Sequence, residues 1–257
     1  MTDDNATLTL HALSGVPMVK QGDDLAEIIL LALDRAGLRL DDGDIIALAQ
    51  KIVSKAEGRL INLDTVTASP RAEELAVEAD KDPRLMELIL AESQDVLRIR
   101  KGAIIVRHNL GLVLANAGID QSNVDHSGKT LALLLPLDPD ASAQRLREVL
   151  RARSGADVAV VIIDSLGRAW RTGTLGTAIG VAGMPGMIDL RGLPDLHGRK
   201  LETSELGFAD EVAAAASLVM GQANEGRPVV LVRGVGYDRR EGNAQELIRP
   251  RQMDLFS

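Results

Sequence analysis

Short runs of apolar residues alternate with polar and glycine-rich segments along the whole chain. Runs of about 4–8 apolar residues bounded by turn-forming residues are typical of buried strands. The clearest run is VAVVIID at residues 158–164, and VVLVRG at 229–234 is the last. The strands predicted by this pattern are 7–13, 45–49, 103–107, 110–115, 131–135, 158–164 and 229–234.

Start and stop signals predict helices between these strands. Acidic or hydroxyl caps, proline at the first helical position and glycine after the last residue mark several of their ends. The helices predicted in this way are 22–37, two short ones within 69–93 that divide near Asp82-Pro83, 141–153 and 203–220. Residues 173–198 are rich in glycine and proline, and they predict a long loop region.

Strands and helices alternate irregularly, without an internal repeat. This order predicts an α/β or α+β fold in which helices pack on mixed sheets. We expect residues 1–257 to form a single domain, with one candidate subdomain boundary near 138–141. Residues 246–257 are expected to form a helical or disordered tail.

The composition excludes several classes of protein. The 257 residues include no cysteine, so disulfides, thiolate zinc sites and thiol nucleophiles are ruled out. A net charge of −8 and an aromatic content of 2% argue against a nucleic-acid partner, which would need cationic and stacking side chains. The polar start is unlike a signal peptide, and no apolar run is long enough to cross a membrane. We therefore expect a soluble cytoplasmic protein.

Two acidic residues follow predicted strands, where ligands collect in open α/β sheets. Asp164 ends the strand 158–164 and precedes Ser165, so the pair either caps a turn or gives two oxygen ligands to Mg²⁺ or Mn²⁺. Asp120 and Asn123 follow the strand 110–115 in a turn-prone segment that, taken alone, fits a plain loop better. Two such acids in one chain strengthen the metal hypothesis.

Cationic residues also gather after predicted strands. Lys51 and Lys55 are four residues apart, so a helical turn would place both on one face. Arg168 and Arg171 flank Trp170, and arginine binds phosphate or carboxylate through two parallel hydrogen bonds. Each of these could instead be an ordinary surface charge. Their positions beside strand ends favour a role in binding anions.

Several motifs in sequence order together resemble a known family. They are VPMVKQGDDL, DGDIIALAQKIVSKAEGR, NAGIDQSNVD, LLPLDPDASA, IIDSLGRAWRTGTLGTAIG, DLHGRKLETSELGFADEVAAAASLVMG and PVVLVRG. Over about residues 8–238 the chain resembles the coenzyme F420-0:L-glutamate ligase (F420:gamma-glutamyl ligase) family. The resemblance implies the mixed α/β fold of that family, a homodimer, GTP as co-substrate, and Mg²⁺ or Mn²⁺ at two sites, with K⁺ as a further cation.

The resemblance also assigns roles to residues of this chain. The implied metal ligands are Asp120, Asp164, Ser165 and Gln222. The implied GTP-binding residues are Pro17, Met18, Val19, Lys20, Gln50, Lys51, Lys55, Asn123, Met220, Gly221, Gln222, Ala223, Asn224, Glu225, Gly226 and Arg227. To these we add Lys51, Lys55, Arg168 and Arg171 as catalytic cations that hold phosphates or acidic substrates.

Gln222 departs from the family pattern, in which glutamate is common at this position as a metal ligand. Its neutral amide offers an oxygen with less charge, and the ligand could shift elsewhere, for example to Glu225. Ser165 replaces a frequent threonine and keeps the hydroxyl.

The activity implied by the resemblance is amide formation between L-glutamate and coenzyme F420-0, or its dehydro form. The terminal carboxylate of the cofactor would attack the γ-phosphate of GTP, and glutamate would then displace phosphate from the acyl phosphate. Phosphoryl transfer relies on positioning and charge neutralisation, so it needs no covalent nucleophile. Two alternatives stay open: a related ligase with another carboxylate acceptor, and a nucleotide-binding protein without turnover.

Overall fold

The computed structural model of the chain describes residues 6–121 and 130–254. Its largest sheet has the strand order β1-β12-β2-β8-β9. These strands are Thr9–Ala12 (β1), Val229–Arg233 (β12), Ile45–Ala49 (β2), Ala159–Gly167 (β8) and Thr174–Ala182 (β9). β2 and β8 pair in parallel, and the other neighbours pair antiparallel. The mixed sheet with packed helices confirms the predicted fold class.

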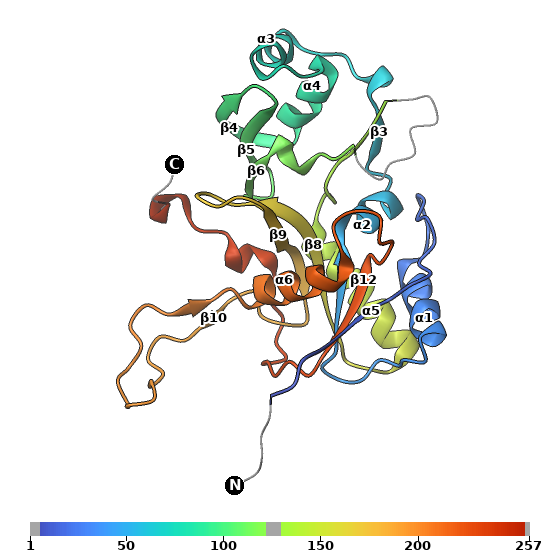
Figure 1. The fold of residues 1–257 in the computed structure, drawn as a ribbon, viewed down its shortest axis with the longest axis vertical. Helices are drawn as coiled ribbons and strands as arrows, with labels where there is room; N and C mark the ends of the chain where they lie inside the picture. The colour runs from blue at the N-terminus through green and yellow to red at the C-terminus, as the bar shows by residue number, and fades with distance from the viewer. Residues whose placement is uncertain (1–5, 122–129, 255–257) are drawn as a thin grey trace.

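Helices cover both faces of this sheet (Figure 1). Leu25–Arg35 (α1), Gln50–Ala56 (α2) and Pro139–Ser154 (α5) pack on one face, against alternate residues of β2 and β8 such as Leu48 and Ile162. Phe208–Met220 (α6) packs on the other face, against their neighbours such as Ala47 and Val161. Because both faces are buried, these strands read in the sequence as continuous apolar runs.

A small lobe with its own core lies beyond the end of the sheet (Figure 1). It consists of Pro70–Ala79 (α3), Pro83–Ala91 (α4), Ser93–Arg100 (β4), Ala103–His108 (β5), Val113–Ala115 (β6) and the 3₁₀ turn Asn116–Gly118 (η2). The strand pair Leu60–Asn62 (β3) and Leu131–Leu133 (β7) and the turn Leu63–Thr65 (η1) connect it to the main sheet. The predicted division of 69–93 into two helices is confirmed, since Asp82 caps a second helix that begins at Pro83.

The remaining elements lie after β9. Ile188–Asp189 (β10) and Glu205–Leu206 (β11) pair at the base of a projecting arm, which we define as residues 188–206 (Figure 1). The chain ends in the 3₁₀ turns Ala244–Leu247 (η3) and Arg251–Met253 (η4). No described helix is long and apolar enough to cross a bilayer.

The prediction of a loop over 173–198 was wrong for 174–182 and 188–189, which form β9 and β10, whereas 183–187 and 190–198 lie outside the helices and strands. The glycines of β9 serve close packing rather than turns. A Cβ atom on Gly176 would lie 2.5 Å from the backbone oxygen of Ala213 in α6, and one on Gly180 would lie 2.4 Å from that of Pro139 in α5. The glycines therefore allow two helices to approach the same strand.

Other boundaries also differ from the predictions. β8 continues three residues past Asp164 because its outer part pairs with β9 as a hairpin. β4 was missed, since its half-exposed sequence SQDVLRIR lacks an apolar run. α6 begins at Phe208 rather than near residue 203, and α5 begins at Pro139, one residue after its cap Asp138.

Candidate active site

A cavity of about 500 Å³ opens where β2 and β8 end. Four separate parts of the chain line it: residues 16–19, residues 49–55 around the start of α2, residues 163–165 of β8, and residues 217–228 at the end of α6 and beyond it. In Figure 1 the segment that follows α6 curves round α2 before it enters β12. Because β2 and β8 are parallel, with Ala49 opposite Ile163, Gln50 and Asp164 follow at the same edge.

The structure brings most of the sequence-predicted nucleotide residues to this cavity. Its lining includes Pro17, Met18, Val19, Gln50, Lys51, Lys55 and every residue from Met220 to Arg227. Lys20 is exposed and lies outside the lining, where its backbone N–H donates to Asp23. Asn123 lies outside the described residues.

Two carboxylates and a lysine lie close together, of which Asp164 and Lys51 line the cavity and Asp120 does not. Lys51 Nζ lies 2.5 Å from Asp120 Oδ2. Desolvation, to which the charge of Asp120 adds, raises the pKa of Asp164 to about 6. The Ser165 N–H, the Lys51 ammonium and the Gln50 amide act in the opposite direction. Asp120 is thus close enough to influence the ionisation of Asp164, and a shared metal between the two stays a prediction.

Gln50, the first residue of α2, lies beside the Asp164 carboxylate. Its side chain is buried, and Ser54 Oγ donates to its Oε1 at 2.8 Å. Its Nε2 makes no hydrogen bond of good geometry among the described residues, although it is close enough to Asp164 to stabilise the charged form of that carboxylate. A buried amide N–H without a well-formed hydrogen bond is costly, so this group is suited to donate to an oxygen of a bound substrate.

Lys55 stands one helical turn after Lys51. Burial lowers its pKa, and the nearby Lys51 charge lowers it further, whereas Asp120 acts in the opposite direction. Two lysines so close together repel each other, and an anion between them stabilises both charges. The pair is therefore suited to phosphate or carboxylate groups in the cavity.

Several oxygen atoms that could bind a metal ion lie together around Asp164. The Ser165 backbone N–H donates to Asp164 Oδ1 at 2.8 Å, and Ser165 Oγ donates to Gln222 Oε1 at 2.6 Å. No cluster of three or more His, Asp or Glu side chains suited to a metal occurs among the described residues. Two carboxylates, a hydroxyl and an amide oxygen still fit Mg²⁺ or Mn²⁺, which take oxygen ligands and share their sites with water and substrate phosphates.

A second hollow, of about 570 Å³, lies between the small lobe and the start of α5. Its lining includes Asp138 and Asp140 but, among the described residues, neither lysine nor arginine. An anionic substrate is disfavoured there, so we place the candidate active site in the cavity with Lys51 and Lys55.

Comparison with known proteins identifies the family of the chain. A family model described as F420-0:Gamma-glutamyl ligase matches residues 15–234. The chain is 47% identical over 251 residues to coenzyme F420:L-glutamate ligase of Methanothermobacter thermautotrophicus, covering 97% of this chain and 98% of that protein. It is 44% identical to the protein of the same name from Methanopyrus kandleri, covering 97% and 98%. The chain belongs to the F420-0:gamma-glutamyl ligase family.

In this member of the ligase family, Gln222 and Glu225 have different surroundings. Gln222 faces Ser165, as described above. Glu225 Oε2 instead accepts from the Ala223 N–H at 2.8 Å, and this backbone hydrogen bond lowers the pKa of Glu225. Glu225 thus stabilises the turn of its own loop, while Gln222 is the one beside the carboxylates.

Arg168 and Arg171 lie apart from the other predicted ligase residues. Both are exposed, in the loop that joins β8 to β9, and neither belongs to the described lining of the cavity. Arg168 Nη1 donates to the Gly173 carbonyl at 3.4 Å, across this loop. The structure therefore joins Lys51 and Lys55 to the cavity but places the two arginines at the tip of a hairpin.

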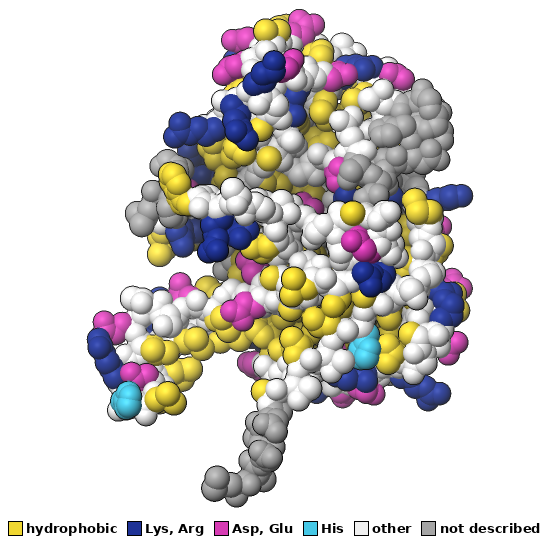
Figure 2. Space-filling view, in the orientation of Figure 1, with side chains coloured by type: hydrophobic (Ala, Val, Ile, Leu, Met, Phe, Trp, Pro, Cys, Tyr) yellow, Lys and Arg dark blue, Asp and Glu magenta, His cyan; other side chains and the backbone are white. Residues whose placement is uncertain are grey.

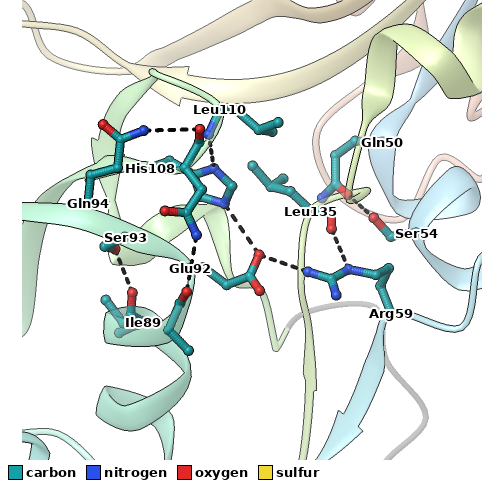
Figure 3. Close-up of polar contacts among 12 residues, drawn as sticks. Gln50, Ser54, Arg59, Ile89, Glu92, Ser93, Gln94, His108, Leu110 and Leu135 are labelled. Carbon is teal, nitrogen blue, oxygen red and sulfur yellow. Dashed lines mark hydrogen bonds and ion pairs between the residues drawn. The ribbon is translucent and has the colours of Figure 1, made fainter.

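Sequence reasoning missed a buried polar network beside the ligase cavity. Figure 3 shows Glu92 between Arg59 and His108. Arg59 Nη2 donates to Glu92 Oε2 at 2.8 Å, its Nε donates to the Leu135 carbonyl, and His108 Nε2 lies 3.5 Å from Glu92 Oε2. Burial opposes ionisation, but His108 and Arg59 together hold the pKa of Glu92 below its usual value. This network links the small lobe to the main sheet, and no local motif marks it.

Proposed function

We propose that this chain ligates L-glutamate to coenzyme F420-0, or its dehydro form, and converts GTP to GDP and phosphate. One observation carries the proposal: four distant segments bring two lysines, the Asp164 carboxylate and the segment 220–227 around a single cavity, and Asp120 pairs with Lys51 of this lining. The family and the names of its relatives support glutamate ligation to F420. The choice of GTP is part of the proposal.

The proposed reaction has two steps. The terminal carboxylate of the cofactor attacks the γ-phosphate of GTP, which forms an acyl phosphate and releases GDP. The amine of glutamate then attacks the acyl carbon, so an amide forms and phosphate leaves with the electron pair of the broken C–O bond. The amine loses a proton to water or to a basic group.

The residues of the cavity favour this chemistry by charge and position. Lys51 and Lys55 offset the negative charge that gathers when two anionic substrates meet. The Gln50 side chain and the backbone of residues 220–227 line the cavity, where they would orient the nucleotide. Asp120 and Asp164 would hold one divalent cation, with Ser165 and Gln222 beside a second. Such a cation, Mg²⁺ or Mn²⁺, supplies charge neutralisation to the phosphate oxygens when bound. K⁺ is a further cation to be tested.

We also propose that the enzyme is a homodimer that acts in the cytoplasm, with neither nucleic acid nor membrane as partner. The arm of residues 188–206 projects from the main body, and hydrophobic side chains are visible along it in Figure 2. Leu193 and Leu196 of the arm are exposed, Leu196 fully. A second copy of the chain would remove these side chains from water.

The direct test incubates purified protein with GTP, MnCl₂, L-glutamate and coenzyme F420-0. We expect GDP together with a product heavier by one glutamyl unit, detected by mass spectrometry. Absence of the heavier product would overturn the proposal. Sedimentation of the same preparation tests the homodimer.

Gln222 favours one alternative, a related ligase with another carboxylate acceptor, because its neutral amide changes the site beside Asp164. GDP release is therefore compared with and without each acceptor. Release that requires a different acceptor would support the alternative. Tight GTP binding without release at any metal concentration would indicate a nucleotide-binding protein without turnover.

A further inference from the structure

The tip of the β8–β9 hairpin presents the single tryptophan of the chain to solvent. The pairing of β8 with β9 ends at Gly167 and Thr174, and the residues between them form the tip. Residues 167–174 are all exposed, and Trp170 is 89% exposed. Its φ of 63° lies in the left-handed region, which a bulky residue rarely adopts. Such a conformation at an exposed aromatic residue suggests that the side chain is displayed for contact.

Trp170 is also the one aromatic side chain, among those that the structure describes, that is open to a planar ligand. The rings of Phe208 and Tyr237 pack against each other with centroids 5.7 Å apart, at the start of α6. Phe256 lies outside the described residues. The described lining of the cavity contains no aromatic residue. A ligand with a large planar ring would therefore find its stacking surface at the hairpin tip.

The strand that carries Trp170 also carries the candidate active site. Asp164 and Ser165 line the cavity, and the pairing with β9 continues without a break from Asp164 to Gly167. Leu166, between them, packs against the main core. At about 3.3 Å per residue, Trp170 lies at most about 20 Å from Asp164 along this strand. The hairpin is thus a short connection between the reacting centre and an exposed indole.

Two cations accompany the indole. Arg168 and Arg171 lie on either side of Trp170 and are both exposed. Arginine side chains pair with phosphate and carboxylate groups and also stack on planar rings. The tip therefore combines the features that bind an aromatic ring with an anionic chain attached to it.

We propose that Trp170 is the stacking surface for the deazaflavin ring of the acceptor, and that Arg168 and Arg171 contact its anionic chain. This inference rests on the proposed function, since the acceptor must span the distance from the tip to the cavity. Its reacting carboxylate then lies beside Asp164 while its ring lies on the hairpin. The arginines predicted as catalytic are assigned instead to acceptor binding.

The test compares Trp170→Ala, Trp170→Phe and a control, Val77→Ala, which removes an exposed apolar side chain from α3. Binding of coenzyme F420-0 is measured from the polarisation of its own fluorescence, without nucleotide. Loss of an aromatic stacking partner weakens binding by about 5- to 100-fold. We expect a loss in this range for Trp170→Ala, a loss below about threefold for Trp170→Phe, and none for Val77→Ala.

Steady-state kinetics separate this role from a structural one. For Trp170→Ala, KM for the acceptor should rise by the same factor, while KM for GTP and for glutamate stays unchanged. Unchanged acceptor binding would overturn the inference. A change in oligomeric state on sedimentation would also overturn it, because Trp170 would then contact a second copy.

The two proposals fail in different ways. If the wild-type protein binds the acceptor through Trp170 but makes no GDP, the proposed nucleotide chemistry is wrong and the inference stands. If the wild-type protein ligates glutamate while Trp170→Ala keeps its acceptor affinity, the inference is wrong and the proposed function stands.

Discussion

The hydroxyl of Ser165 donates a hydrogen bond of 2.6 Å to the side-chain oxygen of Gln222. The bond joins β8 to the loop after α6, and it lies beside the Asp164 carboxylate. Ser165 Oγ and Gln222 Oε1 could each bind a cation, but here they are hydrogen-bonded to each other. The Gln222 oxygen belongs to a neutral amide. Changing the charge of this amide should alter the site more than changing its size.

Gln222→Glu should strengthen metal binding, because the affinity of an oxygen site increases with the number of its carboxylates. We expect the Kd for Mn²⁺ to fall by about tenfold, measured by calorimetry. In the metal-free protein the same change should lower the melting temperature, since three carboxylates would lie close together. Gln222→Met, which removes the oxygen without adding charge, is the control. Equal Mn²⁺ affinity in both variants would contradict the prediction.

Asp164→Asn should stabilise the metal-free protein while abolishing turnover. The folded-state pKa of Asp164, about 6, exceeds its usual value of 3.8, so the folded protein retains a proton that the unfolded chain releases. Stability therefore falls as the pH rises between these values, and the loss is complete at about pH 7.5. Asparagine cannot ionise, so the variant avoids this loss of stability. Relative to the wild type, its free energy of unfolding should be higher by about 1–3 kcal/mol at about pH 7.5 and little changed at about pH 4. Urea denaturation at both pH values measures this.

Asp210→Asn provides the matched control. Burial also raises the pKa of Asp210, which accepts from the Ala178 N–H, but Asp210 does not line the cavity. The Asp210→Asn variant should therefore be more stable than the wild type at neutral pH and should keep its turnover. Equal pH profiles for Asp164→Asn and the wild type would show that Asp164 is not perturbed.

The sequence pattern was most informative where both faces of a strand are buried. β2, β8 and β12 appear as apolar runs because helices cover the sheet on both sides, and β2 was predicted at its observed bounds. β9 was misread because its glycines, which accommodate α5 and α6, look locally like turn residues. Only the tertiary packing shows whether a glycine lies in a turn or in a strand that a helix approaches closely.

For the candidate active site, residue types identified individual side chains but not how these side chains are arranged in space. Asp120 and Asp164 were candidates from their positions after apolar runs, and the structure brings them together with Lys51. The pairing of Lys51 with Asp120 joins residues far apart in sequence, so no local signal could reveal it. The distance of Arg168 from the cavity depends on the length of the β8–β9 hairpin, whose second strand was predicted as part of a loop.

Lys51→Met should reduce turnover by about 100-fold, because it removes a cation from the carboxylates and substrate phosphates. The comparison is Lys101→Met, which breaks an exposed ion pair with Asp80 in the small lobe. Exposed pairs contribute little, so this variant should match the wild type in kcat and melting temperature. If the two variants behave alike, Lys51 has no role in turnover.

Gly176→Ala should destabilise the enzyme, since the new methyl group would overlap α6 at Ala213 and Ser217. Overpacking of this kind costs about 1–3 kcal/mol. Gly167→Ala in the same hairpin is the control, because nothing lies within 4 Å of its Cβ position. Thermal unfolding of both variants measures the difference, and similar melting temperatures would show that α6 can shift without penalty.

Asp140→Ala should destabilise the junction between α5, β9 and η3. Its Oδ1 accepts from the backbone N–H groups of Val181 and Ala244, each at 2.8 Å. Removal leaves two buried donors without a partner, at about 1–3 kcal/mol each. Asp140→Asn keeps an oxygen acceptor and should lose less. Denaturant unfolding measures the stability of the wild type and of both variants. Equal losses of stability in the two variants would show that the charge of Asp140, rather than its oxygen acceptor, is responsible.

The parallel pairing of β2 with β8 has a consequence for the order of folding. It joins residues 45–49 to residues 159–163, and the small lobe lies between them in the sequence. Contacts between distant residues form slowly, because a long loop must close first. The lobe has its own apolar cluster of mostly local contacts. We therefore expect the lobe to condense first and shorten the effective loop, so that the central strands, and with them the catalytic edge, assemble late on the folding pathway.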